Sequence, residues 1–430
     1  MTVLRARTLS FTSKPDGEDH AGVDYREDTI LIIENGVIQK KCTPKQYAAE
    51  GGKLENVTRL FGLLVPGFVD CHIHYPQMDI IGSHGTQLLD WLDRYAFPAE
   101  QAYHSKAYAQ LRAQAFVDLL CRYGTTTALT FTTIHPHATD ALFEAVAAVN
   151  ARWIAGKVLM DRNAPAALCD TDSGDQANRA LIERWHGQDR LSYALTPRFA
   201  ITCSDAQLAA AGALAQEVDG LYVQSHISEH PDEVQETMKL FPDRAHYTDV
   251  YEHFGLLGER SIFAHGIHLS EPELARFEAT GSKIAFCPTS NLFLGSGLLD
   301  LERLDAHGVG YGAASDVGGG TSFSMLTTLA EGYKVCQMNG HNWHPLTALY
   351  TATRGGAQTL SCADRIGSIE AGMEADFVLL NPPEDSWLAG RLEKTNTLTE
   401  EVFACIMLGG ENAVARTWIA GEEVYNRDAT

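Results

Sequence analysis

Three things are missing from this sequence, and each absence narrows the kind of protein it encodes. No two of its nine cysteines form a CxxC pair, which excludes a structural zinc ribbon and a disulfide framework. No apolar run approaches the ~18 residues of a membrane-spanning helix, and the first ten residues have no apolar signal-peptide core. We therefore expect a cytoplasmic protein whose cysteines are mostly small buried hydrophobic residues.

Basic residues are also scarce. The chain has 33 lysines and arginines against 55 aspartates and glutamates, a net charge of −22. This charge repels nucleic acid and anionic membrane surfaces, so we expect neither as a partner. With 45% hydrophobic and 20% charged residues among 430, the chain has the composition of a globular protein rather than a disordered one.

The middle of the chain, residues 64–365, alternates short apolar runs with amphipathic stretches of helical composition. Eight such βα units over roughly 300 residues are typical of a (β/α)₈ TIM-type barrel, an α/β fold. Helices are expected over Ser105–Arg122, Ala141–Val149, Asp205–Val218, Pro231–Lys239 and Glu271–Ala279, with Asp205 as an N-cap. The candidate strands are Leu64–His74, Thr125–Thr133, Trp153–Asp161, Tyr193–Phe199, Leu221–His226, Ser261–His265, Lys283–Cys287 and Val309–Asp316.

The two ends, residues 1–63 and 366–430, have a different pattern. Both contain short extended runs, and Asn35-Gly36 and Ala420-Gly421 are placed where a hairpin would turn. Neither end is long enough to hold a large core alone, so we expect the two to pair into one small β-domain beside the barrel.

The strongest chemical signal is the pair His72 and His74. Residues two apart on a strand face the same way, so both imidazoles project from the carboxyl end of the first barrel strand and can chelate one metal ion. A lone pair of this kind is more often two ordinary hydrogen-bonded histidines, so the interpretation needs further ligands.

Further candidate ligands end other barrel strands: His226 the fifth, His265 the sixth and Asp316 the eighth. Each alone has an ordinary explanation, as a hydrogen-bonded histidine or a helix N-cap aspartate. Together they are hard to explain by chance, because strand ends of a barrel meet at one mouth. Imidazoles with one carboxylate favour zinc, with iron(II) second.

Glu229 follows His226 by three residues, just beyond the fifth strand. Its ordinary interpretation is a first-turn helix acid stabilised by the helix dipole. Beside an activated water, the same carboxylate can accept a proton and return it to substrate.

These motifs together resemble the metal-dependent amidohydrolase superfamily, and within it the guanine deaminase family. The blocks that carry the resemblance are Pro66–Gln77, Leu88–Glu100, Thr196–Phe199, Gln224–Glu229, Cys287–Leu292 and Ser315–Gly319. The match runs from the first strand to about residue 370, and it implies that the domain formed by the chain ends is a small β-sandwich.

The resemblance also implies roles for individual residues. The metal ligands would be His72, His74, His226 and Asp316, with His265 close to the metal water, and the proton-transfer carboxylates would be Glu229 and Asp316. Substrate contacts would be Gln77, Arg198 and Phe199. Relatives with two metals have a carboxylated lysine at the end of the fourth strand, which here reads Thr196–Phe199 without lysine, so we expect one zinc ion per chain.

The function that follows is zinc-dependent hydrolysis of guanine to xanthine and ammonia. One alternative keeps the barrel and metal but changes the substrate to another aminated or chlorinated heterocycle; a second is an inactive barrel that serves as a scaffold. The aromatic segment Leu88–Glu100, with Trp91, Tyr95 and Phe97, either covers the site or forms an ordinary hydrophobic contact or dimer surface, and we expect a homodimer.

Overall fold

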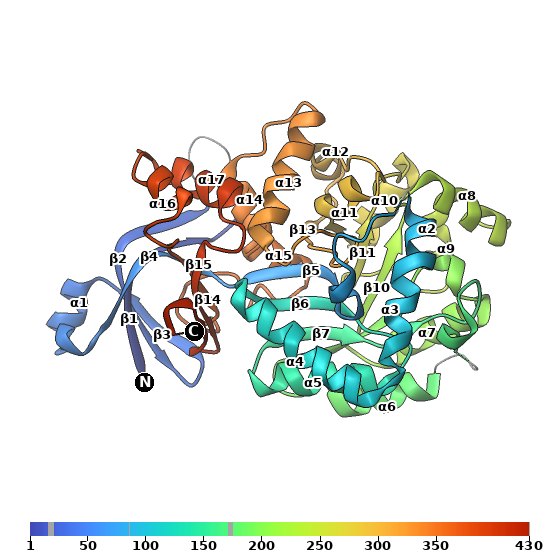
Figure 1. Cartoon of the computed structure of the whole chain (residues 1–430), viewed down its shortest axis with the longest axis horizontal. Helices are drawn as coiled ribbons and strands as arrows, with labels where there is room; N and C mark the ends of the chain where they lie inside the picture. The colour runs from blue at the N-terminus through green and yellow to red at the C-terminus, as the bar shows by residue number, and fades with distance from the viewer. Residues whose placement is uncertain (16–20, 86, 171–174, 430) are drawn as a thin grey trace.

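Parallel strands from the middle of the chain form a closed sheet surrounded by helices, beside a second sheet built from both chain ends (Figure 1). The computed structural model describes residues 1–15, 21–85, 87–170 and 175–429. None of the helices in these ranges is long and apolar enough to cross a membrane.

The strands of the closed sheet follow one another in sequence order, each parallel to its neighbour, and β8 (Val158–Leu159) adds a short pairing to β9. The sheet closes where backbone hydrogen bonds join the first strand to the segment after the last, from Asp316 N to His72 O and from His74 N to Val317 O. The expected barrel is therefore confirmed. Its strands are β5 (Phe68–His74), β6 (Thr125–Phe131), β7 (Arg152–Gly156), β9 (Leu191–Pro197), β10 (Tyr222–Ile227), β11 (Ser261–His265), β12 (Lys283–Phe286) and β13 (Tyr311–Ala313).

Helices surround the barrel on its outer face (Figure 1). Several begin with side-chain caps: Ser105 accepts from Tyr108 N, Ser270 forms a capping box with Glu273, and Ser324 accepts from Thr327 N. The helices after the strands are α4 (Lys106–Arg122), α5 (Pro136–Ala148), α6 (Asp175–Trp185), α7 (Asp205–Glu217), α8 (Pro231–Leu240), α9 (Tyr247–His253), α10 (Glu271–Thr280), α11 (Pro288–Phe293), α12 (Leu301–Ala306), α13 (Met325–Met338), α14 (Pro345–Thr351) and α15 (Arg354–Thr359).

Both chain ends build one mixed sheet in the order β16-β15-β14-β4-β1-β2-β3. The expected hairpin turns at Asn35-Gly36 and Ala420-Gly421 are confirmed, since all four residues have positive φ, which fits two-residue turns of type I′. The strands are β1 (Thr2–Phe11), β2 (Val23–Glu34), β3 (Val37–Cys42), β4 (Thr58–Pro66), β14 (Phe377–Leu380), β15 (Val414–Ile419) and β16 (Glu422–Asn426), with α1 (Pro44–Ala49), α16 (Trp387–Leu392) and α17 (Leu398–Leu408) beside them.

Three local predictions need correction. The single strand Leu64–His74 is divided at Gly67: its first part belongs to β4 of the end sheet and its second part is β5 of the barrel. A side chain at Gly67 would overlap that of Thr126, so the chain can pass between the sheets here only with glycine. The strand Trp153–Asp161 is likewise divided, into β7 and β8. The N-cap of α7 is Ser204, not Asp205.

A buried ionic network joins the end sheet to the amino-terminal side of the barrel. Arg152, which begins β7, donates from Nε to Glu374 Oε2 over 2.9 Å, and Arg190, just before β9, donates from Nη2 to the same oxygen over 2.7 Å. Arg190 also pairs with Asp376, whose Oδ1 accepts from Ala420 N. The barrel and the end sheet are therefore held together on the side away from the strand ends that carry the predicted site.

Candidate metal centre and active site

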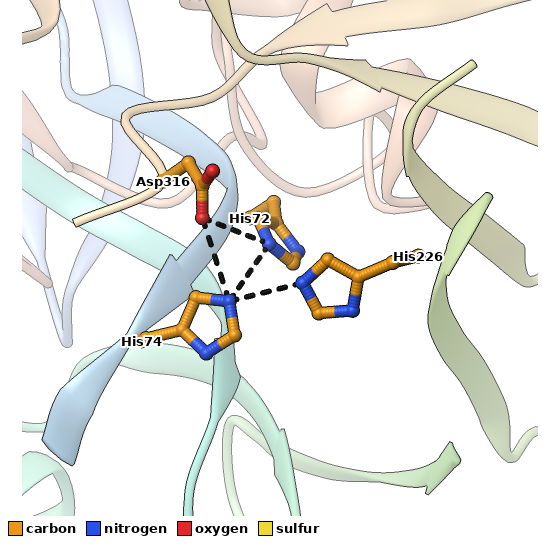
Figure 2. Close-up of side chains that lie close together, drawn as sticks. All are labelled: His72, His74, His226 and Asp316. Atoms are coloured by element: carbon orange, nitrogen blue, oxygen red, sulfur yellow. Dashed lines mark hydrogen bonds and ion pairs between the residues drawn. The ribbon is translucent and has the colours of Figure 1, made fainter. Parts of the chain in front are cut away.

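Four of the predicted side chains converge at the carboxyl ends of barrel strands (Figure 2). His74 Nε2 lies 3.1 Å from both His72 Nε2 and His226 Nε2. The Oδ1 atom of Asp316 lies 3.2 Å from His72 Nε2 and 3.4 Å from His74 Nε2. These four donor atoms form a group of the size and chemistry that a single metal ion binds.

The protonation of the imidazoles suits a cation. Burial lowers the pKa of His72, and it lowers those of His74 and His226 still further, helped by the neighbouring positive charges. The His226 ring is fixed, because its Nδ1 lies 2.6 Å from the carbonyl oxygen of Arg198 and donates to it. Nε2 of His226 therefore presents a lone pair toward His74, and neutral nitrogens that face one another are satisfied by a metal ion between them.

Asp316 stays ionised although it is buried. Burial raises the pKa of its carboxyl, but the hydrogen bond with His72 and the surrounding imidazoles lower it to about 2. Its second oxygen, Oδ2, lies 3.8 Å from His265 Nε2. Asp316 thus faces the metal group with one oxygen and His265 with the other.

Glu229 approaches the same ring nitrogen of His265 as Asp316 does. Its Oε2 is 3.3 Å from His265 Nε2, and its Oε1 accepts from Ser296 Oγ over 2.9 Å. Burial raises the pKa of Glu229 to about 7. Burial lowers the pKa of His265, but the carboxylates of Glu229 and Asp316 outweigh this effect and raise it. Asp316, His265 and Glu229 are therefore close enough to exchange protons, and the raised pKa values of His265 and Glu229 suit this exchange at neutral pH.

Two of these residues have an unusual backbone. His265 and Asp316 have φ angles of 75° and 48°, in the left-handed region that non-glycine residues seldom adopt. Such conformations cost roughly 1–3 kcal/mol and persist only where the surroundings enforce them. Here they turn the last residue of β11 and the third residue after β13 toward the same mouth of the barrel.

The convergent groups open into a pocket with about 420 Å³ of empty space, a volume that includes open solvent. Its apolar wall comes largely from the segment that was expected to cover the site, α2 (Leu88–Trp91) and the π-helical turn η4 (Leu92–Ala96), which supply Leu88, Trp91 and Leu92. Phe199 and Leu294 complete the apolar lining. Of the aromatic residues expected there, Trp91 lines the pocket.

The predicted substrate contacts Gln77, Arg198 and Phe199 all line this pocket and are buried. Gln77 lies on η3 (Tyr75–Ile80), directly after β5, and Arg198 and Phe199 follow β9. These residues lie at the pocket because they follow the carboxyl ends of β5 and β9. The ligand, catalytic and contact roles of these residues remain predictions.

Four further polar residues around the site were not predicted. Glu100 accepts from both Arg198 and Gln77; Asn291 Oδ1 accepts from His265 Nδ1 over 2.8 Å; and Ser296 donates to Glu229. Glu233, which also lines the pocket, accepts from the backbone N of Glu229 over 2.8 Å. Glu100 and Asn291 lie inside the sequence blocks noted above, but nothing in the spacing of the chain pairs them with their partners.

Comparison with known proteins agrees with this geometry. A family model described as the amidohydrolase family matches residues 63–424, and the chain belongs to that family. Its relatives narrow the class: it is 46% identical over 432 residues to the guanine deaminase of Escherichia coli, covering 100% of this chain and 98% of that protein. The expected resemblance to guanine deaminases is thereby confirmed.

Solved structures give the same result. The structure of E. coli guanine deaminase matches with a TM-score of 0.96 and 42% identity, covering 99% of this chain and 100% of that one. A guanine deaminase from C. acetobutylicum, solved with guanine bound in its active site, matches with a TM-score of 0.89 and 25% identity, covering 99% and 100%.

Proposed function

We propose that this protein hydrolyses guanine to xanthine and ammonia with one zinc ion per chain. The observation that carries the proposal is that the four-donor group, Glu229 and the Arg198–Gln77 pair all face one pocket, in a chain similar over its whole length to guanine deaminases.

The metal would be held by His72, His74, His226 and Asp316. When bound, zinc supplies Lewis-acid chemistry that lowers the pKa of a coordinated water toward ~7; iron(II) is the second choice for this donor set. A second possible group, His265, Cys287 and Asp316, shares Asp316. Because burial raises the pKa of the Cys287 thiol well above its ordinary value, that group lacks an ionised sulfur at neutral pH. We therefore favour one metal.

The chain's own residues then move the protons. Asp316 and His265 orient the attacking water and take its proton, since His265 Nε2 and Asp316 Oδ2 face one another across 3.8 Å. The water oxygen attacks C2 of guanine while Glu229 delivers a proton to N3. A pKa near 7 suits Glu229 to give a proton and take one back. Asp316 and His265 then return the water's proton to the exocyclic amine, and the new hydroxyl group on C2 gives its proton back to Glu229. The C2–N bond breaks, so the amine leaves as ammonia and a carbonyl forms at C2.

Recognition of guanine would rest on Arg198, Gln77 and Phe199. Guanine is neutral and planar and has acceptors on its edge, which suit a fixed guanidinium, an amide and an aromatic wall. A guanidinium directed at the O6 carbonyl would reject adenine, which has an amine donor at that position.

Ultraviolet spectra of guanine incubated with the purified protein test the proposal directly, because xanthine has a different spectrum. Adenine, cytosine and a chlorotriazine are assayed in parallel. If any of these is turned over faster than guanine, the protein is a hydrolase of another heterocycle. If the folded, metal-loaded protein is inactive on all four compounds, the scaffold alternative is favoured.

We also infer a cytoplasmic location and a homodimer, both from the sequence. The first is supported by the nine cysteines, which are scattered and form no CxxC pair, as is usual in a reducing compartment. Size-exclusion chromatography with light scattering tests the second, and a monomer at working concentration would contradict it.

A further inference from the structure

A fully buried carboxylate lies next to the pocket and has no part in the reaction described above. Glu100 has an exposed fraction of 0% and belongs to α3 (Phe97–Gln101), the end of the segment that covers the pocket. We infer that Glu100 is a positioning residue that fixes Arg198 and Gln77, and so sets the selectivity for the group at position 6 of the purine. This inference rests on the proposed function.

The contacts of Glu100 are short and convergent. Arg198 donates from Nη1 to both carboxylate oxygens, over 2.7 and 2.8 Å, and Gln77 donates from Nε2 to Oε1 over 2.9 Å. The same helix holds the guanidinium from a second direction, because Cζ of Arg198 lies 5.3 Å from the centre of the Phe97 ring. Phe97 and Glu100 are three residues apart and so share a face of α3.

This arrangement determines which groups point where. A carboxylate only accepts hydrogen bonds, so the Gln77 amide must turn its NH₂ toward Glu100, and its Oε1 then accepts from Gly318 N over 3.3 Å. Among the described residues, the side-chain hydrogen bonds of Arg198 run from Nη1 to Glu100, which leaves Nε and Nη2 as the donors available to a ligand. The pair of opposite charges is neutral overall, which lets a neutral purine enter a buried site without facing an isolated cation.

The purine that reports this role is 2,6-diaminopurine. It carries the same 2-amine as guanine, so attack at C2 is unchanged, but it presents an amine instead of a carbonyl at position 6. A directed Arg198 discriminates against it, whereas an Arg198 free to turn does not. The ratio of kcat/KM for guanine to that for 2,6-diaminopurine therefore measures how firmly Arg198 is held.

The test compares Glu100→Gln with wild type on both purines, separating xanthine and isoguanine by chromatography. Gln keeps the size of the side chain, but only one of its two terminal atoms is an oxygen. It therefore cannot accept all the hydrogen bonds that Arg198 and Gln77 donate to the two carboxylate oxygens. We expect kcat/KM for guanine to fall about 10- to 100-fold, mainly through KM, the range that fits loss of a charge-assisted hydrogen bond. The selectivity ratio should fall by about 10-fold or more, while metal content and the pH profile of kcat stay as in wild type.

Two further variants separate positioning from a general structural role. Glu100→Asp keeps the charge on a shorter side chain and should give a selectivity ratio between those of wild type and Glu100→Gln. If Glu100→Gln does not fold, Glu100→Asp still tests the inference, because its ratio should lie below that of wild type. Glu273→Gln removes another buried carboxylate, which accepts from Ser270 N and Thr248 N outside the pocket, and should leave the ratio unchanged.

A double-mutant cycle tests whether Glu100 acts through Arg198. If Glu100 acts through Arg198, then Glu100→Gln should not change the ratio further in an Arg198→Met background. Additive effects, an unchanged ratio in both Glu100 variants, or an equal change in Glu273→Gln would overturn the inference. Wild-type protein that does not deaminate guanine would instead refute the proposed function, so the two failures are distinct.

Discussion

Replacing Glu229 by Gln is the most direct test of the proton-transfer scheme. The variant keeps the length and shape of the side chain, and its amide oxygen can still accept from Ser296 Oγ, which lies 2.9 Å from Glu229 Oε1. What it loses is the ability to take up and release a proton beside His265, whose Nε2 is 3.3 Å from Glu229 Oε2. We expect turnover of guanine to collapse while zinc content stays near that of wild type.

The size of the effect can be bounded. General acid–base groups contribute typically ~10²–10⁴ in rate, and at 1.36 kcal/mol per factor of ten this is about 2.7–5.5 kcal/mol of barrier. Glu229 is fully enclosed and also faces the ring that orients the water, so we expect at least this range in kcat.

The pH profile supplies a second readout. Burial raises the pKa of Glu229 from its ordinary 4.5 to about 7, and a metal ion held nearby would lower it again. Because Glu229 must carry the proton that it delivers to N3, activity of wild type should fall as the pH rises through an apparent pKa between these two values. The residual activity of Glu229→Gln should not show the part of this pH-dependent decrease that is due to Glu229.

Stability shows whether the variant is folded. Because the pKa of Glu229 is higher in the folded than in the unfolded chain, ionisation between pH 4.5 and 7 destabilises the fold, and the full cost is present above pH 7. Gln has no such cost. The metal-free variant should therefore melt no lower than metal-free wild type at pH 8, and its advantage should vanish below pH 4.5. Normal turnover by a folded, zinc-loaded Glu229→Gln would refute the scheme and leave Glu229 as a helix-end acid.

Three other predictions concern the metal, the substrate and the fold. Elemental analysis should find about one transition metal per chain, and His72→Ala and His226→Ala should lose metal and activity together; two tightly held metals, or an active metal-free protein, would contradict this. Arg198→Met should reduce guanine turnover far more than metal content or melting temperature, and equal losses of all three would favour a structural role. Glu374→Ala leaves the buried Arg190 and the half-buried Arg152 short of their partner, so it should lower the free energy of unfolding by about 3–5 kcal/mol, measured by urea denaturation, with kcat of the folded fraction unchanged; a loss below 1 kcal/mol would mean that the network contributes little.

The sequence predicted the parts of the site that depend on strand periodicity. His72 and His74 share a strand face, and counting eight strands brings His226, His265 and Asp316 to the same barrel mouth, where the structure has them. Such placement needs only the period of a strand and the shape of a barrel.

Residues outside that periodicity were not predictable. Glu100 reaches Arg198 from a segment that combines α-, π- and 3₁₀-helical turns, for which no simple repeat exists. The division at Gly67 was missed because Leu64–Pro66 and Phe68–Ile73 are buried alike, so the apolar pattern does not show where one sheet ends and the other begins. Ser204 and Asp205 are both good N-caps, and composition alone does not choose between neighbours.

The interleaved end sheet has a consequence for biosynthesis. Strand β4 pairs with β14, which the ribosome makes only after the whole barrel. Until then the apolar edge of β4 lacks its neighbour, and an open strand edge invites pairing with other chains. The edge of β4 therefore stays open while every barrel strand is synthesised, and the nascent chain is most prone to aggregation just before β14 (Phe377–Leu380) emerges. Slow translation or scarce chaperones should therefore reduce the yield of this protein. The loss should come from aggregation at the open edge of β4, not from misfolding of the barrel.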